Sequence, residues 1–254
     1  MKRILFLLTA VCALLPVLTP ASASPWQEAF DKGNGLYARE DYPQALDAYE
    51  TALQSGYESW ELFFNMGNAH YRTGNYPLAI LYYERAARLN PKEQDIQDNL
   101  HLAESKIADH FEDMPEFFAT ACWLGFIKTF SASGWAMAVF LFFFLSLASV
   151  FLYLSSHTYG RKRAGFYSML VSSALCILCL CAAAGVHNEM QKEFAIVMDT
   201  SVEAKTSPEE RSETKFVLHE GSKVLIEDHI APYYKVRIKN GSRAWVPVDC
   251  LERI

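Results

Sequence analysis

Residues 60–93 read WELFFNMGNAHYRTGNYPLAILYYERAARLNPKE, and they repeat the pattern of residues 26–59 at a spacing of 34 positions. Eleven positions are identical in the two copies: Trp26/Trp60, Phe30/Phe64, Gly33/Gly67, Asn34/Asn68, Tyr37/Tyr71, Tyr42/Tyr76, Pro43/Pro77, Ala45/Ala79, Tyr49/Tyr83, Glu50/Glu84 and Ala52/Ala86. A period of this length is typical of helix–turn–helix arrays, which bind other proteins. The repeat therefore predicts an α-helical binding region and argues against an enzyme.

Each copy has the features of two helices joined by a polar turn. Small residues recur where two helices must approach closely, and a proline opens the second helix, where its missing N–H costs nothing. Residues 94–110 then place apolar side chains three and four positions apart, which predicts an amphipathic capping helix. We expect a repeat domain over residues 24–110, with repeats 26–59 and 60–93 and a capping helix 94–110.

The second copy closely resembles the tetratricopeptide repeat family, on the run 64–71 and on Tyr76, Ala79, Tyr83, Ala86 and Pro91. The first copy matches less well, because Lys32 stands where an apolar residue is usual. The resemblance implies a protein-binding groove lined by the first helix of each unit. Its implied residues are Asn34, Tyr37, Phe64, Asn65, Asn68, Tyr71 and Arg72. Packing of Tyr37, Phe64 and Tyr71 between helices stays open as the alternative.

Asn34 and Asn65 also match the asparagine pair of the carboxylate clamp found in some members of that family. The basic partners of such a clamp are absent, since Phe30, Asp95 and Asn99 occupy their positions. Without cations a buried carboxylate would be poorly stabilised. An amphipathic or apolar peptide is therefore a better candidate ligand than a free chain terminus.

Three long apolar runs divide the rest of the chain. Residues 1–23 have a basic start, an apolar stretch and a small-residue cleavage site, which predicts a signal peptide; an uncleaved anchor is the alternative. The runs 135–154 and 164–186 carry no charge and are long enough to span a membrane. The loop 155–163 between them holds three adjacent bases and should face the cytoplasm, which leaves both chain ends on the periplasmic side.

The segment 111–134 is rich in aromatic residues and too short and polar to span, so we expect an interfacial linker on the outer leaflet, with a disordered linker as the alternative. Ser133 is expected to cap the first membrane helix and Trp135 to lie in its aromatic belt. The cysteines show no disulfide framework. A packing role for Cys176, Cys179 and Cys181 is favoured over a metal or redox role.

Residues 190–254 change to strand periodicity. Short β-rich runs are expected at 194–198, 202–206, 215–219, 223–227, 234–239 and 243–248, with a hairpin turn at Asn240-Gly241. Such strands suit a small barrel. The segment resembles a bacterial SH3-like domain on 202–205, 216–221, Val224, 234–236 and 244–246. That resemblance implies a binding face for peptides or cell wall, for which Tyr233, Tyr234 and Trp245 are candidates; Trp245 is equally suited to the core.

The expected fold class is thus multidomain: an α-helical tetratricopeptide repeat domain, a two-helix transmembrane hairpin and a small all-β SH3-like barrel. This order resembles the BatE-like family of aerotolerance-operon proteins. The resemblance implies an inner-membrane envelope component beside von Willebrand A-domain proteins and a MoxR-type ATPase. It predicts a scaffold; a peptidoglycan-binding anchor or sensor is the alternative.

The residues themselves exclude several classes of function. Residues 24–110 hold 14 acidic and 7 basic side chains, which speaks against a nucleic-acid partner. The histidines show no metalloprotease spacing, the chain has no phosphate loop, and the two spans hold no ionisable carboxylates. We therefore predict no catalytic residues, no metal and no cofactor.

Overall fold

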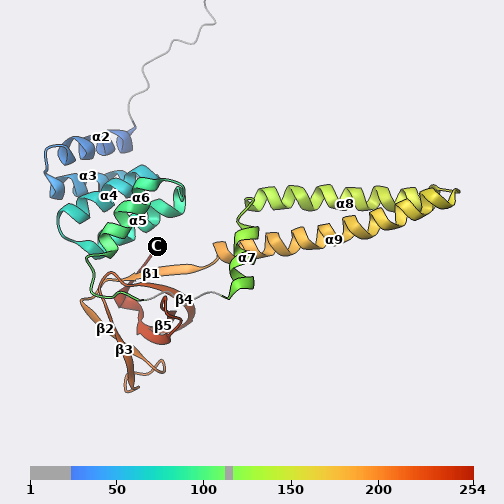
Figure 1. The fold of residues 1–254 in the computed structure, drawn as a ribbon. Helices are drawn as coiled ribbons and strands as arrows, with labels where there is room; N and C mark the ends of the chain where they lie inside the picture. The colour runs from blue at the N-terminus through green and yellow to red at the C-terminus, as the bar shows by residue number, and fades with distance from the viewer. Residues whose placement is uncertain (1–23, 112–116) are drawn as a thin grey trace, which may run out of the picture. The chain divides into compact units, whose positions relative to one another are not determined.

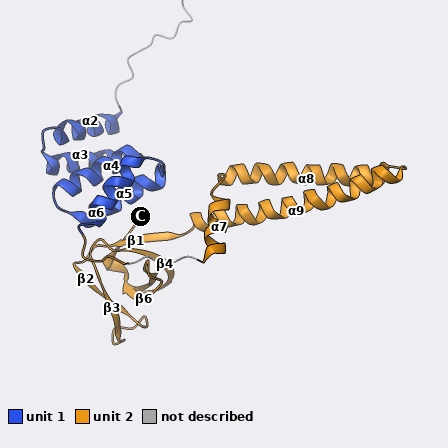
Figure 2. Ribbon diagram, viewed as in Figure 1, with its two compact units in different colours: residues 1–106 blue, residues 107–254 orange. Residues whose placement is uncertain are grey.

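The computed structural model describes residues 24–111 and 117–254, so the predicted signal peptide 1–23 lies outside the described residues. The chain divides into two compact units, residues 1–106 and residues 107–254 (Figure 2). Figure 1 shows helices alone in the first unit, and a long helical hairpin and a β-sheet in the second.

The first unit contains α2 (Pro25–Tyr37), α3 (Tyr42–Gln54), α4 (Trp60–Arg72), α5 (Tyr76–Leu89) and α6 (Gln94–Glu104). This confirms the predicted helix, turn, helix pattern of both copies. The pairs α2–α3 and α4–α5 pack as hairpins, and α4 also contacts α2 and α6. The first helices of successive units are therefore neighbours, as a stacked repeat requires.

Close helix packing explains the glycines that recur in the two first helices. A Cβ on Gly33 would lie 2.4 Å from the ring of Tyr49, and one on Gly67 would lie 2.6 Å from the ring of Tyr83. Both tyrosines are almost fully buried. The ring of the second helix thus fills the space that glycine leaves on the first helix, and the same contact forms in both copies.

The second unit begins with helices. The short apolar helix α7 (Phe118–Ile127) precedes α8 (Ala132–Ser155) and α9 (Tyr159–Met190), which lie side by side as an antiparallel hairpin (Figure 1). Among the described residues, α8 and α9 are the two helices whose length and composition would let them cross a membrane. Both extend beyond the apolar runs from which they were predicted.

Small side chains hold α8 and α9 together. Hydroxyl pairs join Ser146 to Ser173 at 2.9 Å and Ser149 to Ser168 at 2.8 Å. Gly165 lies against the backbone of α8, where an added Cβ would be 2.9 Å from the Tyr153 nitrogen. Hydrogen bonds between serines and contacts through small residues are typical of helix pairs in lipid.

Two sequence predictions about the start of α8 were wrong. Ser131 caps the helix, because its hydroxyl accepts from the Gly134 N–H at 3.3 Å, while Ser133 bonds to the Ser131 hydroxyl instead. Trp135 is 4% exposed and donates from Nε1 to the Ile127 carbonyl at 2.9 Å. Its ring therefore belongs to the contact between α7 and the hairpin, not to an exposed aromatic belt.

The rest of the second unit is one antiparallel sheet. Its strands are β1 (Glu193–Val197), β2 (Ser201–Lys205), β3 (Thr214–His219), β4 (Lys223–Ile230), β5 (Tyr233–Arg237), β6 (Arg243–Pro247) and β7 (Leu251–Arg253). The strand order is β3-β2-β6-β5-β4-β1-β7. The sheet is open, with β3 and β7 at its edges, so the barrel closure expected from the sequence is not shown. Gly241 has a φ of 81° in the predicted β5–β6 hairpin turn.

Asp109 attaches the segment that precedes the hairpin to this sheet. Its Oδ2 accepts from the His219 backbone N–H at 2.8 Å and from the Ser222 hydroxyl at 2.5 Å, and its Oδ1 contacts His219 Nδ1 at 2.7 Å. Phe111 packs against the sheet core beside it. The helix α6 ends at Glu104, so Asp109 lies beyond the capping helix that was predicted to reach residue 110, and it is held on the sheet by residues more than a hundred positions later in the chain.

Candidate functional site

The predicted groove residues lie on the first helices α2 and α4. We call the surface formed by Asn34, Tyr37, Phe64, Asn65, Asn68, Tyr71 and Arg72 the first-helix face. Arg72 is exposed and the other six are half-buried. None is part of the fully buried core, so each contributes atoms to the surface.

A ladder of hydrogen bonds runs across this face. The Oδ1 of Asn34 accepts from the Tyr49 hydroxyl at 2.9 Å and from the Asn65 Nδ2 at 3.0 Å. One repeat later, the Oδ1 of Asn68 accepts from the Tyr83 hydroxyl at 2.7 Å and from the Asn99 Nδ2 at 2.9 Å. The same three-residue unit is therefore built twice.

The ladder leaves the side-chain amide donors of Asn34 and Asn68 available, one in each repeat. With each Oδ1 occupied twice, the Nδ2 groups of Asn34 and Asn68 make no hydrogen bond to the described residues. A side-chain amide has two N–H donors, and these suit the carbonyl oxygens of an extended peptide. The face can therefore offer main-chain contacts that do not depend on the peptide sequence.

Aromatic rings surround the ladder. Tyr37 packs edge-on against Tyr42 with ring centres 5.2 Å apart, and Tyr71 packs against Tyr76 in the same way at 5.6 Å. Phe64 lies 5.9 Å from the ring of Tyr83. Each ring therefore packs on its own repeat and still reaches the surface, so the two alternatives for these rings, packing and groove lining, are compatible.

Arg72 joins the two repeats at the same surface. Its Nε donates to the Tyr42 hydroxyl at 3.1 Å, and its guanidinium lies 5.5 Å from the centre of the Tyr42 ring. Burial raises the pKa of Tyr37, and the nearby Arg72 charge only partly opposes this. Burial also raises the pKa of Tyr49 and of Tyr83. The hydroxyls of Tyr49 and Tyr83 therefore stay protonated at neutral pH and act as hydrogen-bond donors in the ladder.

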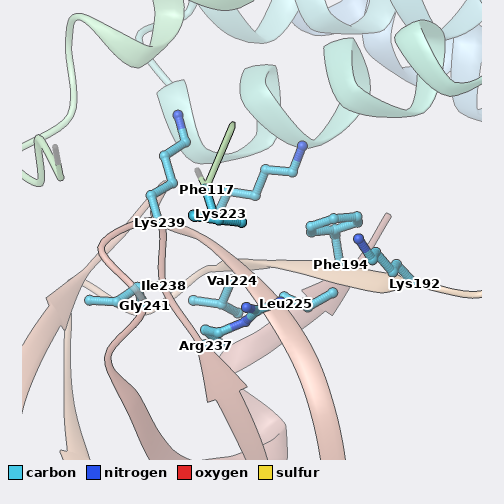
Figure 3. Close-up of a pocket in the computed structure, with 10 residues that line it drawn as sticks. All are labelled: Phe117, Lys192, Phe194, Lys223, Val224, Leu225, Arg237, Ile238, Lys239 and Gly241. Carbon is cyan, nitrogen blue, oxygen red and sulfur yellow. The ribbon is translucent and has the colours of Figure 1, made fainter. Parts of the chain in front are cut away.

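A second candidate site is a cavity of about 440 Å³ on the sheet. Figure 3 shows four cationic side chains around it, Lys192, Lys223, Arg237 and Lys239, together with the ring of Phe194. Lys223 Nζ lies 4.7 Å from the centre of that ring. Glu227 pairs with Arg237 at 2.9 Å, and Glu189 pairs with Lys192 at 2.6 Å. The lining is cationic and aromatic, which suits an anionic ligand.

The structure corrects the predicted SH3-like face. Tyr233 is 8% and Tyr234 is 7% exposed, so both rings are buried. Trp245 is half-buried, with Lys235 Nζ 6.0 Å from its ring centre, and it alone of the three presents substantial surface. Alternation along β5 could not separate these roles, because Tyr233 and Tyr234 are adjacent and both are buried.

Outside these sites, the His, Ser, Cys, Asp and Glu side chains of the described residues do not form a catalytic arrangement. Asp109, His219 and Ser222 lie together, but the Ser222 hydroxyl donates to Asp109 and not to His219, so no nucleophile is paired with a base. Within residues 24–111 and 117–254, no group of three or more His, Cys, Asp or Glu side chains could hold a metal ion. The five cysteines in these ranges are free.

Sequence reasoning missed the part that Asn99 plays in the site. Asn99 follows Asn65 by the same 34 positions that separate the two copies. The period therefore continues into α6, which supplies the amide that completes the second ladder unit. Extending the self-comparison beyond residue 93 would have found it, because Ile96 and Leu100 also fall at the positions of Leu62 and Met66.

Comparison with known proteins agrees with this geometry over the repeats. Residues 30–93 match the family model described as tetratricopeptide repeat. That segment is a tetratricopeptide repeat region, a class that mediates protein–protein interaction and scaffold roles, and no catalytic family is indicated. No curated protein matches the chain.

Solved structures give weaker likenesses. YrrB, a TPR protein with an unusual peptide-binding site, is 18% identical with a TM-score of 0.31, covering 65% of this chain and 70% of that chain. The Sgt2 TPR domain from Aspergillus fumigatus is 18% identical with a TM-score of 0.30, covering 61% of this chain and 83% of that chain.

Proposed function

We propose that the chain is a non-enzymatic adaptor of the bacterial inner membrane, which presents its repeat domain and its sheet domain to the periplasm and assembles envelope protein complexes there. The observation that carries the proposal is the doubled ladder on the first-helix face. Two amide donors one repeat apart, flanked by aromatic rings, suit an extended peptide with apolar side chains.

The absence of cations on the ladder itself defines the ligand further. Asn99 donates to Asn68 from a position where a carboxylate clamp would need a basic side chain. A free terminal carboxylate would meet uncharged amide donors on the ladder, and the one cation of the first-helix face, Arg72, donates to the Tyr42 hydroxyl instead. We therefore propose an internal peptide segment as the ligand of this face.

The membrane placement rests on the exposed surface of the hairpin. Only 6% of the most apolar stretch of α8 and 17% of that of α9 are buried by the described residues. A core helix of a water-soluble protein of this length would be mostly buried, because large exposed apolar surfaces are rare on such proteins. The basic residues between the two helices favour a cytoplasmic hairpin tip and two periplasmic chain ends.

The order of the parts supports a narrower placement. We propose a BatE-like envelope component, with von Willebrand A-domain proteins and a MoxR-type ATPase as its partners and a stress or aerotolerance role. A deletion strain complemented by this chain tests the role directly: oxygen sensitivity of the deletion and its rescue are expected. Equal growth of the deletion and the parent in air would reject the aerotolerance role and leave the adaptor role standing.

Site-specific photocrosslinking in intact cells tests the adaptor role. A photoreactive residue at Tyr37 or Tyr71 should give the same partner adduct, because both positions border one ladder. The exposed Asp47 and Glu50 on α3 are the control positions. An Asn34→Ala/Asn68→Ala variant should remove the adduct and stay in the membrane fraction. Adducts of equal yield from all four positions would contradict the proposal.

The cationic cavity of the sheet favours a second candidate function, the binding of anionic peptidoglycan stems. Four basic side chains line one cavity, and the carboxylates of a stem peptide are ligands that such side chains pair with. This function would make the chain a cell-wall anchor or sensor. It would use the cavity and not Tyr233 or Tyr234.

Sedimentation with purified sacculi separates the two functions. The detergent-solubilised full chain should pellet with sacculi if the cavity binds stem peptides, and Lys223→Gln/Arg237→Gln/Lys239→Gln should stay in solution. A charge-matched Lys32→Gln/Arg39→Gln/Lys92→Gln variant, altered at exposed positions of the repeat domain, should still pellet. A wild-type chain that stays in solution would reject wall binding alone.

A further inference from the structure

All the Lys and Arg side chains of α8 and α9 lie at the hairpin tip. Arg161, Lys162 and Arg163 lie in the first turns of α9, and no Asp or Glu occurs anywhere from residue 132 to residue 188. No ion pair joins these three cations to any described residue. The tip therefore holds three positive charges that the described protein does not neutralise.

Aromatic rings shape this charge into a site. A cavity of about 440 Å³ is lined by Tyr153 on α8 and by Tyr159, Lys162, Arg163, Phe166 and Tyr167 on α9. Lys162 Nζ lies 5.8 Å from the centre of the Tyr153 ring, and the Arg163 guanidinium lies 5.7 Å from that of Tyr167. The rings thus keep both cations at the cavity, and the lining contains no acidic side chain.

The surface of these rings is open. Tyr159 is 80% exposed, Tyr167 is 50% exposed and Phe166 is 43% exposed. In water such a cluster would leave a large apolar surface uncovered, whereas tyrosine at a membrane surface places its ring among acyl chains and its hydroxyl among headgroups. The rings therefore suit contact with the acyl chains of a lipid, and the hydroxyls and cations suit contact with its headgroup.

We propose that this cavity binds the headgroup of an anionic phospholipid. The phosphate would accept hydrogen bonds from the Arg163 guanidinium and Lys162 ammonium, and the acyl chains would lie along the apolar surface of α8 and α9. The proposal rests on the membrane placement of the hairpin proposed above. A free phosphate has the same headgroup chemistry and lacks the chains, which the test uses to separate the two sources.

The test uses the full chain in nanodiscs of equal parts phosphatidylglycerol and phosphatidylcholine. Native mass spectrometry after release into detergent should find phosphatidylglycerol retained in preference to phosphatidylcholine. Arg161→Gln/Lys162→Gln/Arg163→Gln should lose this preference, because each cation near a lipid surface contributes about fivefold. Nanodiscs carry the same lipids on both sides, so a change of orientation caused by the lost charges does not affect the result.

Three controls make the result specific. Lys32→Gln/Arg39→Gln/Lys92→Gln removes the same charge from the repeat domain and should keep the preference. Tyr159→Leu keeps all the cations and should weaken retention about threefold, since it removes one hydroxyl-bearing ring from the cavity. Added glycerol 1-phosphate should not displace the lipid.

The outcomes distinguish failure of the lipid site from failure of the membrane placement. Equal retention of the two lipids by the wild-type chain, or full retention by the triple tip variant, overturns the lipid site. Displacement of the lipid by glycerol 1-phosphate assigns the cavity to a free phosphate ligand and also overturns it. Release of the wild-type chain from cell membranes by alkaline carbonate overturns both this inference and the membrane placement.

Discussion

The two tetratricopeptide copies share eleven identical positions and differ in how deeply they are buried. In the second copy Leu62 and Met66 are fully buried, whereas Glu28 and Lys32 hold the same positions in the first copy and are exposed. The second copy has a neighbour on each side, α2–α3 before it and α6 after it; the first has its described packing partner on one side.

The difference shows that each repeat contains two kinds of position: those that pack the two helices of one repeat together, and those that pack one repeat against its neighbour. Positions that shape a single helix pair, such as Gly33/Gly67 and Tyr49/Tyr83, are the same in both copies. Positions that face the preceding repeat are charged and exposed in the first copy, and they are apolar and buried in the second copy, where α2–α3 packs against them. Polar outer faces of this kind end an array without exposing its core.

Substitution of the packing glycines tests this comparison most strongly. Gly67→Ala should destabilise the repeat domain by about 2–3 kcal/mol, because its new Cβ meets the buried Tyr83 ring and both sides are packed. Gly33→Ala should cost about half as much, since α2 can shift outward. Gly35→Ala meets no atom within 4 Å and should stabilise the helix slightly. Urea titrations of the full chain, read by pulsed hydrogen exchange, measure all three. Equal costs at positions 33 and 67 would contradict the role of the neighbour.

His70 gives the second repeat an acid sensitivity that the first repeat lacks. Its ring stacks on Tyr82, its Nε2 has no partner among the described residues, and burial lowers its pKa from 6.5 to about 4. The neutral ring is the stable form, so stability is complete above pH 6.5 and is lost as the pH falls toward 4. At pH 5 the loss should be about 2 kcal/mol.

The first repeat supplies the matched substitution for this test, because Leu36 occupies the position of His70. His70→Leu should remove the loss of stability between pH 6.5 and 5, as measured by urea titration at each pH. Leu36→His should introduce a smaller acid step, since that position is only half-buried. An unchanged pH profile in His70→Leu would assign the acid sensitivity to another group.

The hydrogen-bond ladder should respond equally in the two repeats. Tyr49→Phe and Tyr83→Phe each remove one hydroxyl donor and leave the asparagine with its second donor, so each should cost about 1 kcal/mol. Urea titration measures both, with Tyr57→Phe as a control whose hydroxyl makes no hydrogen bond within the described residues. A loss of unfolding free energy in only one repeat would show that burial of the tyrosine, and not the shared hydrogen-bond geometry, determines how much each hydroxyl stabilises the domain.

The turns of the two copies give the smallest expected effect. Glu40 has a φ of 63°, a left-handed conformation, and Gly74 has a φ of 81° at the corresponding position. Glu40→Gly should stabilise the first repeat by about 0.5 kcal/mol, because relief of strain slightly exceeds the entropy that glycine adds to the unfolded chain. Gly74→Glu should cost about 1 kcal/mol. Thermal unfolding of both variants checks the opposite signs.

Much of the architecture follows from local pattern. The 34-residue period predicted the helix pairs, and alternation predicted six of the strands, because both signals depend on neighbours along the chain. The short strand β7 was missed, since it pairs with β1, and Leu251 and Val197 are separated along the chain by all the other strands. Ser131 and Ser133 could not be separated as caps, because either serine fits the same local pattern.

The candidate sites divide in the same way. The groove asparagines were predicted from the resemblance to the tetratricopeptide repeat family. Their roles as acceptors and donors became visible only in the structure, where Tyr49 and Asn65 contact Asn34. Tyr233 and Tyr234 were assigned to a face by their aromatic character, but the pairing of β5 with β4 and β6 buries both rings. Exposure of a strand residue depends on what packs against it.

By itself, the sequence determined the repeat template, the two long apolar helices and the strand segments, since period and apolar length are properties of consecutive residues. Only the tertiary structure decided which amides stay available, which tyrosines are buried and which linker residue is held by His219 and Ser222. Those outcomes depend on groups that lie far apart in the chain and become neighbours when it folds.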